Sequence, residues 1–358
     1  MENLIRINFI IPFKARRPTG GVRMMYEYAN RLAELGYSVH VSYSLKTKFI
    51  KYRWSYPIRF LLSRIEGFST NEWFAFHKSI TREYVNEVSE RYVKDADVVI
   101  ATWWSTAMDM GQLSSKKGKK INLIQGYEDW EGHVDLLHAS YNMDDVTNVV
   151  VSSYLEKKIS NYTQKKPVLI FNAIDNNKFY LAKSIEKRNP ETICMLYSIQ
   201  EIKGTEYGLE ALKIVKEYYP SLKVELFGIC PEPEGLPEWM KFYRNPEDLS
   251  DLYNRNAIFI SNSLTEGMAL TPMEAMACGC ASILTDIDGH ADYGKNGETA
   301  LMYEAKNTDQ LVNRLLEFIK DNQKRITIAR NGNSFVQQFS WDNAIHKMDH
   351  LIKTLLDK

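Results

Sequence analysis

The chain has 358 residues, too many for a single hydrophobic core, so its length predicts two domains. Hydrophobic residues make up 44% of the sequence and charged residues 25%, values typical of a globular protein in water. The 45 Lys and Arg residues balance the 45 Asp and Glu residues, so the net charge gives no reason to expect a nucleic-acid partner.

The composition also predicts no membrane span, no signal peptide and no zinc site. No stretch approaches about 18 uninterrupted apolar residues, and Met1–Pro12 lacks a basic start followed by a long apolar run. The cysteines, Cys194, Cys230, Cys278 and Cys280, do not show the C-x2-C spacing of a zinc site. We expect buried thiols in a reducing compartment.

A glycine pair follows the first predicted strand. The strand covers Ile5–Pro12, the pair is Gly20 and Gly21, and a helical pattern then covers Val22–Leu35. Glycines between a strand and a helix let the backbone approach a ligand closely, although a simple tight turn has the same pattern.

A basic and aromatic segment, residues 46–64, follows the second predicted strand at Tyr37–Ser44. The segment contains six Lys or Arg residues, five aromatic residues and no acidic residue. This composition suits contact with an anionic membrane surface or with a charged acceptor. Alternatively, the aromatic side chains pack on their own domain and the basic ones are solvated.

Strand and helix patterns alternate through the rest of the chain. In the first half we predict a helix over Glu72–Val93 and strands over Ala96–Thr102, Ile121–Gln125, Asn148–Ser153 and Val168–Phe171. In the second half we predict strands over Ile193–Ile199, Lys223–Gly228, Ala257–Ser261 and Cys280–Thr285, and helices over Thr205–Tyr218, Pro246–Tyr253, Thr308–Asp321 and Trp341–Leu355. The alternation predicts two doubly wound parallel sheets, with ligands at the carboxyl ends of the strands.

Two glutamates eight positions apart flank a predicted helix start within Glu266–Gly279. Glu266 lies in the loop, Thr271 is the expected N-cap, and Pro272 fits the first helical position. A helix start offers unpaired N–H groups, which suit phosphate or sugar hydroxyls. The same pattern fits a capping box made by Thr271 and Glu274, with Glu266 as an ordinary surface residue.

The string E-G-M-A-L-T-P-M-E-A-M-A-C-G, from Glu266 to Gly279, resembles the E-x7-E signature of retaining glycosyltransferases of family 4. That signature is usually written E-G-F-G-L-x-x-x-E-A-M-A-x-G, so Met268 and Ala269 depart from it. The stretch from Ser198 to Gly204 is similar to the family's G-R-L-x-x-x-K-G, with Lys203 at the lysine position and Ser198 at the arginine position. Val168–Asp175 resembles the family's I-P-N-G-I-D linker.

The resemblance implies an α/β protein of the GT-B fold, in which two Rossmann-like doubly wound domains face each other across a cleft. We expect an N-terminal acceptor-side domain over residues 1–170 and a nucleotide-sugar domain over residues 171–340. A C-terminal helix within residues 341–358 is expected to cross back to the N-terminal domain.

The resemblance also implies roles for single residues. Glu266 would contact the donor sugar and stabilise positive charge at its anomeric carbon, Lys203 would pair with the diphosphate, and Glu274 would hold the ribose. Alternatively, Lys203 is an ordinary solvated lysine in a surface turn and does not pair with the diphosphate. The donor-binding residues expected on this basis are Gly20, Gly21, Ser198, Lys203, Gly267, Met268, Ala269, Leu270 and Glu274.

Two family positions are replaced in this chain. Gln125, Gly126, Tyr127 and Glu128 stand where the family commonly carries a histidine, and we predict Gln125, Tyr127 and Glu128 on the acceptor side. The cation missing at Ser198 could come from the segment near the glycine pair, which contains Arg16, Arg17 and Arg23.

The implied activity is that of a retaining hexosyl or glycosyl transferase, moving a sugar from a nucleotide-diphosphate sugar to a glycan or lipid-linked acceptor. The setting would be cell-surface polysaccharide or glycolipid synthesis in the cytoplasm, at the inner face of the membrane. No metal and no cofactor are expected, since the chain has no D-x-D cluster in a suitable loop. A non-catalytic sugar-nucleotide-binding protein and a GT-B epimerase or phosphorylase are the alternatives.

Overall fold

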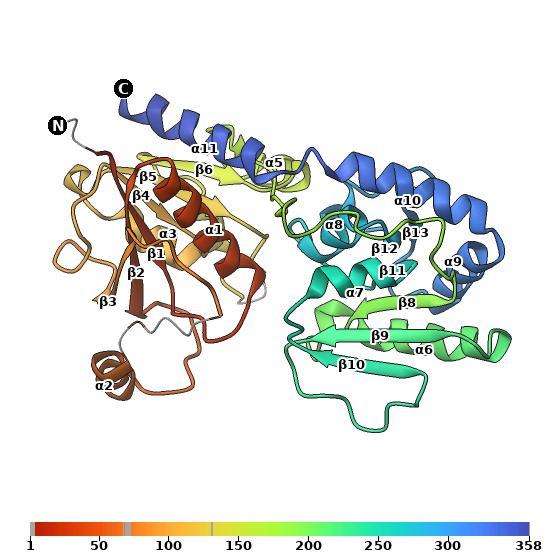
Figure 1. Cartoon of the computed structure of the whole chain (residues 1–358). Helices are drawn as coiled ribbons and strands as arrows, with labels where there is room; N and C mark the ends of the chain where they lie inside the picture. Colours follow the sequence, from red (N-terminus) through yellow and green to blue (C-terminus); the bar gives the residue numbers. More distant parts are fainter. Residues whose placement is uncertain (1–3, 67, 69–72, 130–131, 358) are drawn as a thin grey trace. The chain divides into compact units, whose positions relative to one another are not determined.

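The structure, a computed structural model, describes residues 4–66, 68, 73–129 and 132–357. The chain divides into two compact units (Figure 1). The first unit runs to Phe171 and also includes the segment from Ala344 onward, while the second is Asn172–Asn343.

The described part of the first unit contains one seven-stranded sheet, whose order is β3-β2-β1-β4-β5-β6-β7 and whose neighbouring strands are all parallel. The strands are β1 (Arg6–Ile11), β2 (Ser38–Lys46), β3 (Thr81–Glu87), β4 (Val98–Ala101), β5 (Lys119–Ile124), β6 (Val146–Val150) and β7 (Val168–Leu169). The helices are α1 (Gly20–Glu34), α2 (Tyr56–Glu66), α3 (Trp104–Gly111), α4 (Val134–Ser140), α5 (Ser153–Ser160) and α11 (Trp341–Leu356), which enters this unit at Ala344.

The second unit repeats this architecture with a six-stranded parallel sheet, counted over its described residues, in the order β10-β9-β8-β11-β12-β13. The strands are β8 (Thr192–Leu196), β9 (Lys223–Gly228), β10 (Met240–Arg244), β11 (Ile258–Ser261), β12 (Ala281–Thr285) and β13 (Leu301–Tyr303). The helices are α6 (Thr205–Tyr218), α7 (Leu249–Arg255), α8 (Leu270–Ala277), α9 (Thr308–Lys320) and α10 (Asn322–Val336). The predicted pair of doubly wound parallel sheets is therefore confirmed.

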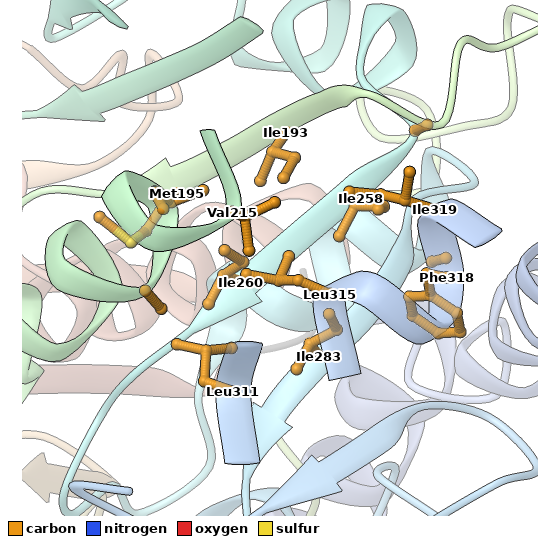
Figure 2. Packing of buried hydrophobic residues seen from close by; sticks show 14 of the residues in the cluster. Ile193, Met195, Val215, Ile258, Ile260, Ile283, Leu311, Leu315, Phe318 and Ile319 are labelled. Atoms are coloured by element: carbon orange, nitrogen blue, oxygen red, sulfur yellow. The ribbon is translucent and has the colours of Figure 1, made fainter. Parts of the chain in front are cut away.

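The core of the second unit shows why these segments fold as they do. Apolar side chains of β8, β11 and β12 pack against one stripe each of α6 and α9 (Figure 2). The stripe of α9 recurs at helical spacing in Leu311, Leu315 and Phe318, all fully buried. Strands covered on both faces read as continuous apolar runs, which is why they are visible in the sequence.

Each sheet has a point where the strand order reverses. β1 lies between β2 and β4, and β8 lies between β9 and β11. The connections that leave two such neighbouring strands run to opposite sides of the sheet, which leaves a crevice at their carboxyl ends. The architecture therefore gives each unit one favoured place for a ligand.

One predicted helix is wrong. Glu72 lies outside the described residues, but Thr81–Glu87 forms strand β3, which pairs in parallel with β2 from His40 opposite Thr81 onward. The charged side chains that gave this stretch a helical appearance suit an exposed edge strand, and pairing with β2 decides the outcome. The sequence interpretation also missed α2, α3, α4, β10, β13 and α10.

Two expectations from composition can be checked directly. All four cysteines are free and buried, as predicted. Across the described ranges, no helix combines the length and apolar character needed to cross a bilayer.

Candidate functional site

Lys203 and Glu266 meet at the strand-order reversal of the second unit. The segment after β8 carries Lys203 at the end of a short 3-10 turn, and the segment after the neighbouring β11 carries Glu266. Lys203 Nζ donates a hydrogen bond to Glu266 Oε1 at 2.5 Å. The two side chains are only 22% and 17% exposed, so water screens this ion pair weakly.

Further contacts fix the carboxylate of Glu266. Ser263 Oγ donates to the same oxygen, Oε1, at 2.8 Å. The backbone at Gly289 packs directly on Glu266, because a Cβ built there would lie 2.5 Å from Glu266 Cβ and 2.6 Å from its carbonyl oxygen. Glu266 is therefore held by a hydroxyl, an ammonium group and a close backbone contact.

A glycine brings the Lys203 turn close to the β11 loop. Gly204 has a φ of +54°, and a Cβ there would lie 2.3 Å from the carbonyl oxygen of Asn262. The amide of Leu264 donates to the carbonyl of Ile202 at 2.8 Å, which ties the two loops together. Glycine is required here because a side chain would both clash and strain this backbone.

Ser198 stabilises the turn that leads to Lys203. Its Oγ accepts a hydrogen bond from the amide of Gln200 at 3.2 Å. Its amide donates to Thr205 Oγ1 at 3.1 Å, and its carbonyl accepts from the same hydroxyl at 2.8 Å. Ser198 thus helps to shape the loop but brings no positive charge to it.

The start of α8 differs from the prediction. Ala269, not Thr271, is the N-cap residue, and no side chain caps the helix. Pro272 is then the third helical residue, a position whose N–H has no partner inside a helix anyway, so proline is tolerated. Because the helix begins at Leu270, Glu274 lies beyond the position that a capping box requires, and that alternative is wrong.

The remaining residues of the glutamate string line the entry to α8. The carbonyl of Met268 accepts from Asn172 Nδ2 at 3.0 Å, and that of Ala269 accepts from the Tyr293 hydroxyl at 3.2 Å. Both residues are buried, as is Glu274 within α8. Gly267 precedes them in the loop. These contacts hold the loop so that the amide groups at the helix start have a fixed direction.

His290 lies beside this cluster and was missed by the sequence interpretation. It is fully buried, and its Nδ1 lies 2.8 Å from the carbonyl oxygen of Thr285, so Nδ1 carries the proton. Burial lowers the pKa of His290 below its ordinary value of 6.5, while the carboxylate of Glu266 acts in the opposite direction. The ring is therefore neutral at pH 7. The sequence interpretation also missed the contacts that Ser263 and Gly289 make with Glu266. Only Ser263, three residues before Glu266, could have been suspected from its position in the sequence.

In the first unit, two predicted residues meet at the corresponding reversal point. Gly20 and Gly21 open α1, whose N-cap residue makes no side-chain cap bond. Gln125, just after β5, donates through Nε2 to the carbonyl of Gly21 at 3.0 Å and to Thr102 Oγ1 at 3.0 Å. The glycine pair and the glutamine thus form one polar edge at the carboxyl ends of the strands.

The other predicted acceptor-side residues have local structural contacts. Glu128 accepts the amide hydrogen of Trp104 at 2.9 Å and so caps the start of α3. The Tyr127 hydroxyl lies 2.8 Å from His138 Nε2, and burial raises the pKa of Tyr127 to about 12. Arg16, Arg17 and Arg23 lie in the segment between β1 and the first turn of α1.

Within residues 4–66, 68, 73–129 and 132–357, no group of three or more His, Cys, Asp or Glu side chains is placed to hold a metal ion.

Comparison with known proteins places this fold in a class. A sucrose-phosphate synthase from Thermosynechococcus elongatus superimposes with a TM-score of 0.77 at 15% identity, covering 98% of this chain and 99% of that one. The Anabaena protein HepE, solved with UDP and glucose, superimposes with a TM-score of 0.73 at 15% identity, covering 98% of this chain and 100% of that one. The chain has the GT-B fold.

Sequence comparison then gives a family match. Residues 176–335, which lie within the second unit, match the family model described as Glycosyl transferases group 1. An uncharacterized glycosyltransferase of Methanocaldococcus jannaschii is 19% identical over 63% of this chain and 64% of its own length. A D-inositol 3-phosphate glycosyltransferase of Corynebacterium urealyticum is 23% identical over 44% of this chain and 41% of its own length. The capsular polysaccharide biosynthesis glycosyltransferase CapM of Staphylococcus aureus is 22% identical over 64% of this chain and 68% of its own length. The matches thus span less than two thirds of the first two relatives.

Proposed function

We propose that the protein transfers a sugar from a nucleotide-diphosphate sugar to a glycan or lipid-linked acceptor, with retention of anomeric configuration. The observation that carries this proposal is the 2.5 Å contact between Lys203 Nζ and Glu266 Oε1 at the reversal point of the second sheet. In a sugar nucleotide the anomeric carbon is bonded directly to a phosphate oxygen. A cation for the leaving diphosphate and an anion for the developing oxocarbenium charge must therefore lie side by side.

The residues around this pair have complementary roles in the proposal. Lys203 and the amides at the start of α8 would stabilise the departing diphosphate, and Glu266 would stabilise the sugar as the bond breaks. Glu274 would accept hydrogen bonds from the ribose hydroxyls. No metal or cofactor is assigned a role. Retention would follow from attack on the face that the diphosphate leaves, with a phosphate oxygen as the base.

On the acceptor side we assign Gln125 as the residue that borders the acceptor hydroxyl. Its amide already joins the glycine pair to the end of β4 through Gly21 and Thr102, so it lies at the favoured ligand position of the first sheet. Tyr127 and Glu128 would support this loop, since their polar groups contact His138 and the start of α3.

The relatives favour particular donors and products. HepE was solved with UDP and glucose, and CapM is named for capsular polysaccharide biosynthesis. We therefore propose a UDP-sugar as the first donor to test and a cell-surface polysaccharide or glycolipid as the product. The reaction would take place in the cytoplasm, at the inner face of the cell membrane.

The experiment has two stages. A thermal-shift screen with UDP-, GDP- and dTDP-sugars identifies the donor, since a ligand at 100 times its Kd adds about 2.7 kcal/mol to stability. Donor-dependent release of nucleotide diphosphate is then measured for the wild type, Glu266→Ala and Lys203→Met. We expect each variant to lose roughly 10²–10³-fold in kcat. Glu298→Ala, an exposed glutamate of the same unit, is the matched control and should retain full activity.

The alternative, a non-catalytic sugar-nucleotide-binding protein, is favoured by one observation. Ser198 occupies the arginine position of the family motif and uses its side chain in a local turn. A donor that raises the melting temperature but releases no nucleotide diphosphate, with any acceptor offered, would support this alternative. Release at the normal rate by Glu266→Ala would refute the role of Glu266.

A further inference from the structure

Helix α2 exposes an apolar face. Ile58, Leu61 and Ile65 are 43%, 60% and 73% exposed. Their spacing of three and four residues places all three on the same side of the helix. A surface helix of a globular protein normally turns such an apolar stripe toward the core, whereas α2 exposes its stripe to solvent.

The opposite side of α2 is attached to its own unit. The Arg59 guanidinium stacks on the Tyr52 ring, 3.4 Å from its centroid, and donates to the carbonyl of Leu45 at the end of β2. The Tyr52 hydroxyl in turn donates to the carbonyl of Pro12 at 2.9 Å. Helix α2 lies at the margin of the first unit (Figure 1). The contacts of Arg59 and Tyr52 hold it there, while Ile58, Leu61 and Ile65 remain exposed.

The segment before α2 exposes further apolar side chains. Trp54 and Phe49 are 46% and 42% exposed, so five large apolar side chains between residues 49 and 65 are accessible to water. Single exposed apolar residues are ordinary, but a cluster of this kind marks an interaction site.

Positive charges predominate around the apolar face, and Glu66 at the end of α2 is the one acidic residue in the sequence from 46 to 66. Lys51, Arg53 and Arg64 are exposed, and residues 46–64 contain no acidic residue. Arg53 lies over the Trp54 ring and Arg64 over the Phe60 ring, at 5.3 and 5.1 Å from the centroids. Long basic side chains that cover apolar surface while keeping their charge in water are typical of the boundary between lipid tails and anionic headgroups.

We propose that α2 lies in the surface of an anionic lipid bilayer. Ile58, Leu61 and Ile65 enter the acyl boundary, and Lys51, Arg53 and Arg64 contact the headgroups. A bilayer suits this surface better than a protein partner does, because the apolar stripe is flanked by predominantly positive charge and anionic lipids supply the matching charge. Binding to a bilayer would bring the proposed transferase close to a membrane-held acceptor. The binding of α2 to lipid does not itself depend on sugar transfer.

The test is flotation of the full chain with vesicles of phosphatidylcholine, with and without phosphatidylglycerol. The wild type should float with the anionic vesicles and bind neutral vesicles much more weakly. Leu61→Gln/Ile65→Gln should bind the anionic vesicles at least about tenfold more weakly. Arg53→Gln/Arg64→Gln should bind the anionic vesicles roughly 25-fold more weakly, from about fivefold per cation.

The matched control is Leu35→Gln, which alters a leucine that is 55% exposed at the end of α1 in the same unit. This variant should bind vesicles like the wild type. Thermal unfolding of each variant verifies that the fold is intact.

Three outcomes would overturn the proposal. The first is a wild-type chain that does not float with anionic vesicles, and the second is an equal loss of binding in Leu35→Gln. The third is sedimentation showing that the wild type is a dimer and Leu61→Gln/Ile65→Gln a monomer, with vesicle binding unchanged; a second copy of the chain would then cover this face. Nucleotide release on a water-soluble acceptor should be unaffected by all these variants, so this proposal and the proposed transfer reaction can fail separately.

Discussion

The close contact between Gly289 and Glu266 permits a sharp test of how precisely the carboxylate must be placed. In Gly289→Ala the new Cβ would lie 2.5 Å from Glu266 Cβ and 2.6 Å from its carbonyl oxygen. Ordinary contacts between carbon atoms are about 3.5–4.0 Å, so the two segments must separate by about 1 Å. Both contacts involve backbone or the root of a side chain, so no rotamer change can relieve them.

The displacement should act mainly on the chemical step. A misplacement of about 1 Å can cost about 10²-fold in rate, which corresponds to about 2.7 kcal/mol of transition-state stabilisation. The overpacking itself should cost about 1–3 kcal/mol of unfolding free energy, which a chain of this size can tolerate. We therefore expect a folded protein whose kcat for nucleotide release falls about a hundredfold.

The assay compares kcat for nucleotide release and the urea midpoint of Gly289→Ala with those of Gly294→Ala. Gly294 lies in the same connection, but a Cβ there meets His290, Leu284 and Met302 at 3.1 Å and does not touch Glu266. The control should lose little activity. If Gly289→Ala is folded and its kcat stays within about threefold of the wild type, the position of Glu266 does not limit the reaction and the reasoning is wrong.

Three further predictions follow from the described contacts. Ser263→Ala removes one hydrogen bond to Glu266 and should lower kcat about tenfold, whereas Ser263→Thr should restore it; equal rates for the three proteins would contradict this. Gln125→Ala removes the bond to Gly21 and should lower the unfolding free energy by about 1 kcal/mol in urea denaturation; an unchanged midpoint would show that the bond contributes nothing. Because the pKa of His290 is lowered from 6.5, the unfolded chain binds a proton near pH 6.5 that the folded chain does not. Stability should be independent of this group above that pH and decrease as the pH falls below it; His290→Gln should show a shallower decrease, and identical slopes would exclude the effect.

The sequence was sufficient to predict those elements and residues whose pattern lies within a single short segment. The buried strands could be predicted because both faces of a parallel sheet are covered and the sequence becomes continuously apolar. Lys203 and Glu266 could be singled out because each follows such a strand within a recognisable string. That β8 and β11 are neighbours, which brings the two side chains together, depends on strand order and is not visible in either string.

The rest of the site depends on contacts between distant segments. Gly289 and His290 reach Glu266 through the loop after β12, which carries no local signature. Helix α8 begins at Leu270, with Ala269 as N-cap, where Asn172 and Tyr293 bind the carbonyls of Met268 and Ala269. These tertiary contacts oppose the local capping preference of Thr271. β3 was taken for a helix because an edge strand with a polar face has no apolar run to reveal it.

The first unit is built from two separate stretches of chain, the second stretch beginning at Ala344 near the C-terminus. Asp349 of α11 accepts a hydrogen bond from Tyr37, a residue encoded more than three hundred positions earlier, at 2.5 Å. During synthesis the N-terminal stretch therefore stays incomplete until the residues from Ala344 onward have been made. The second unit is one continuous stretch of chain and can reach its native state first. We therefore expect the N-terminal stretch of the first unit, although it is made earliest, to depend most on chaperones.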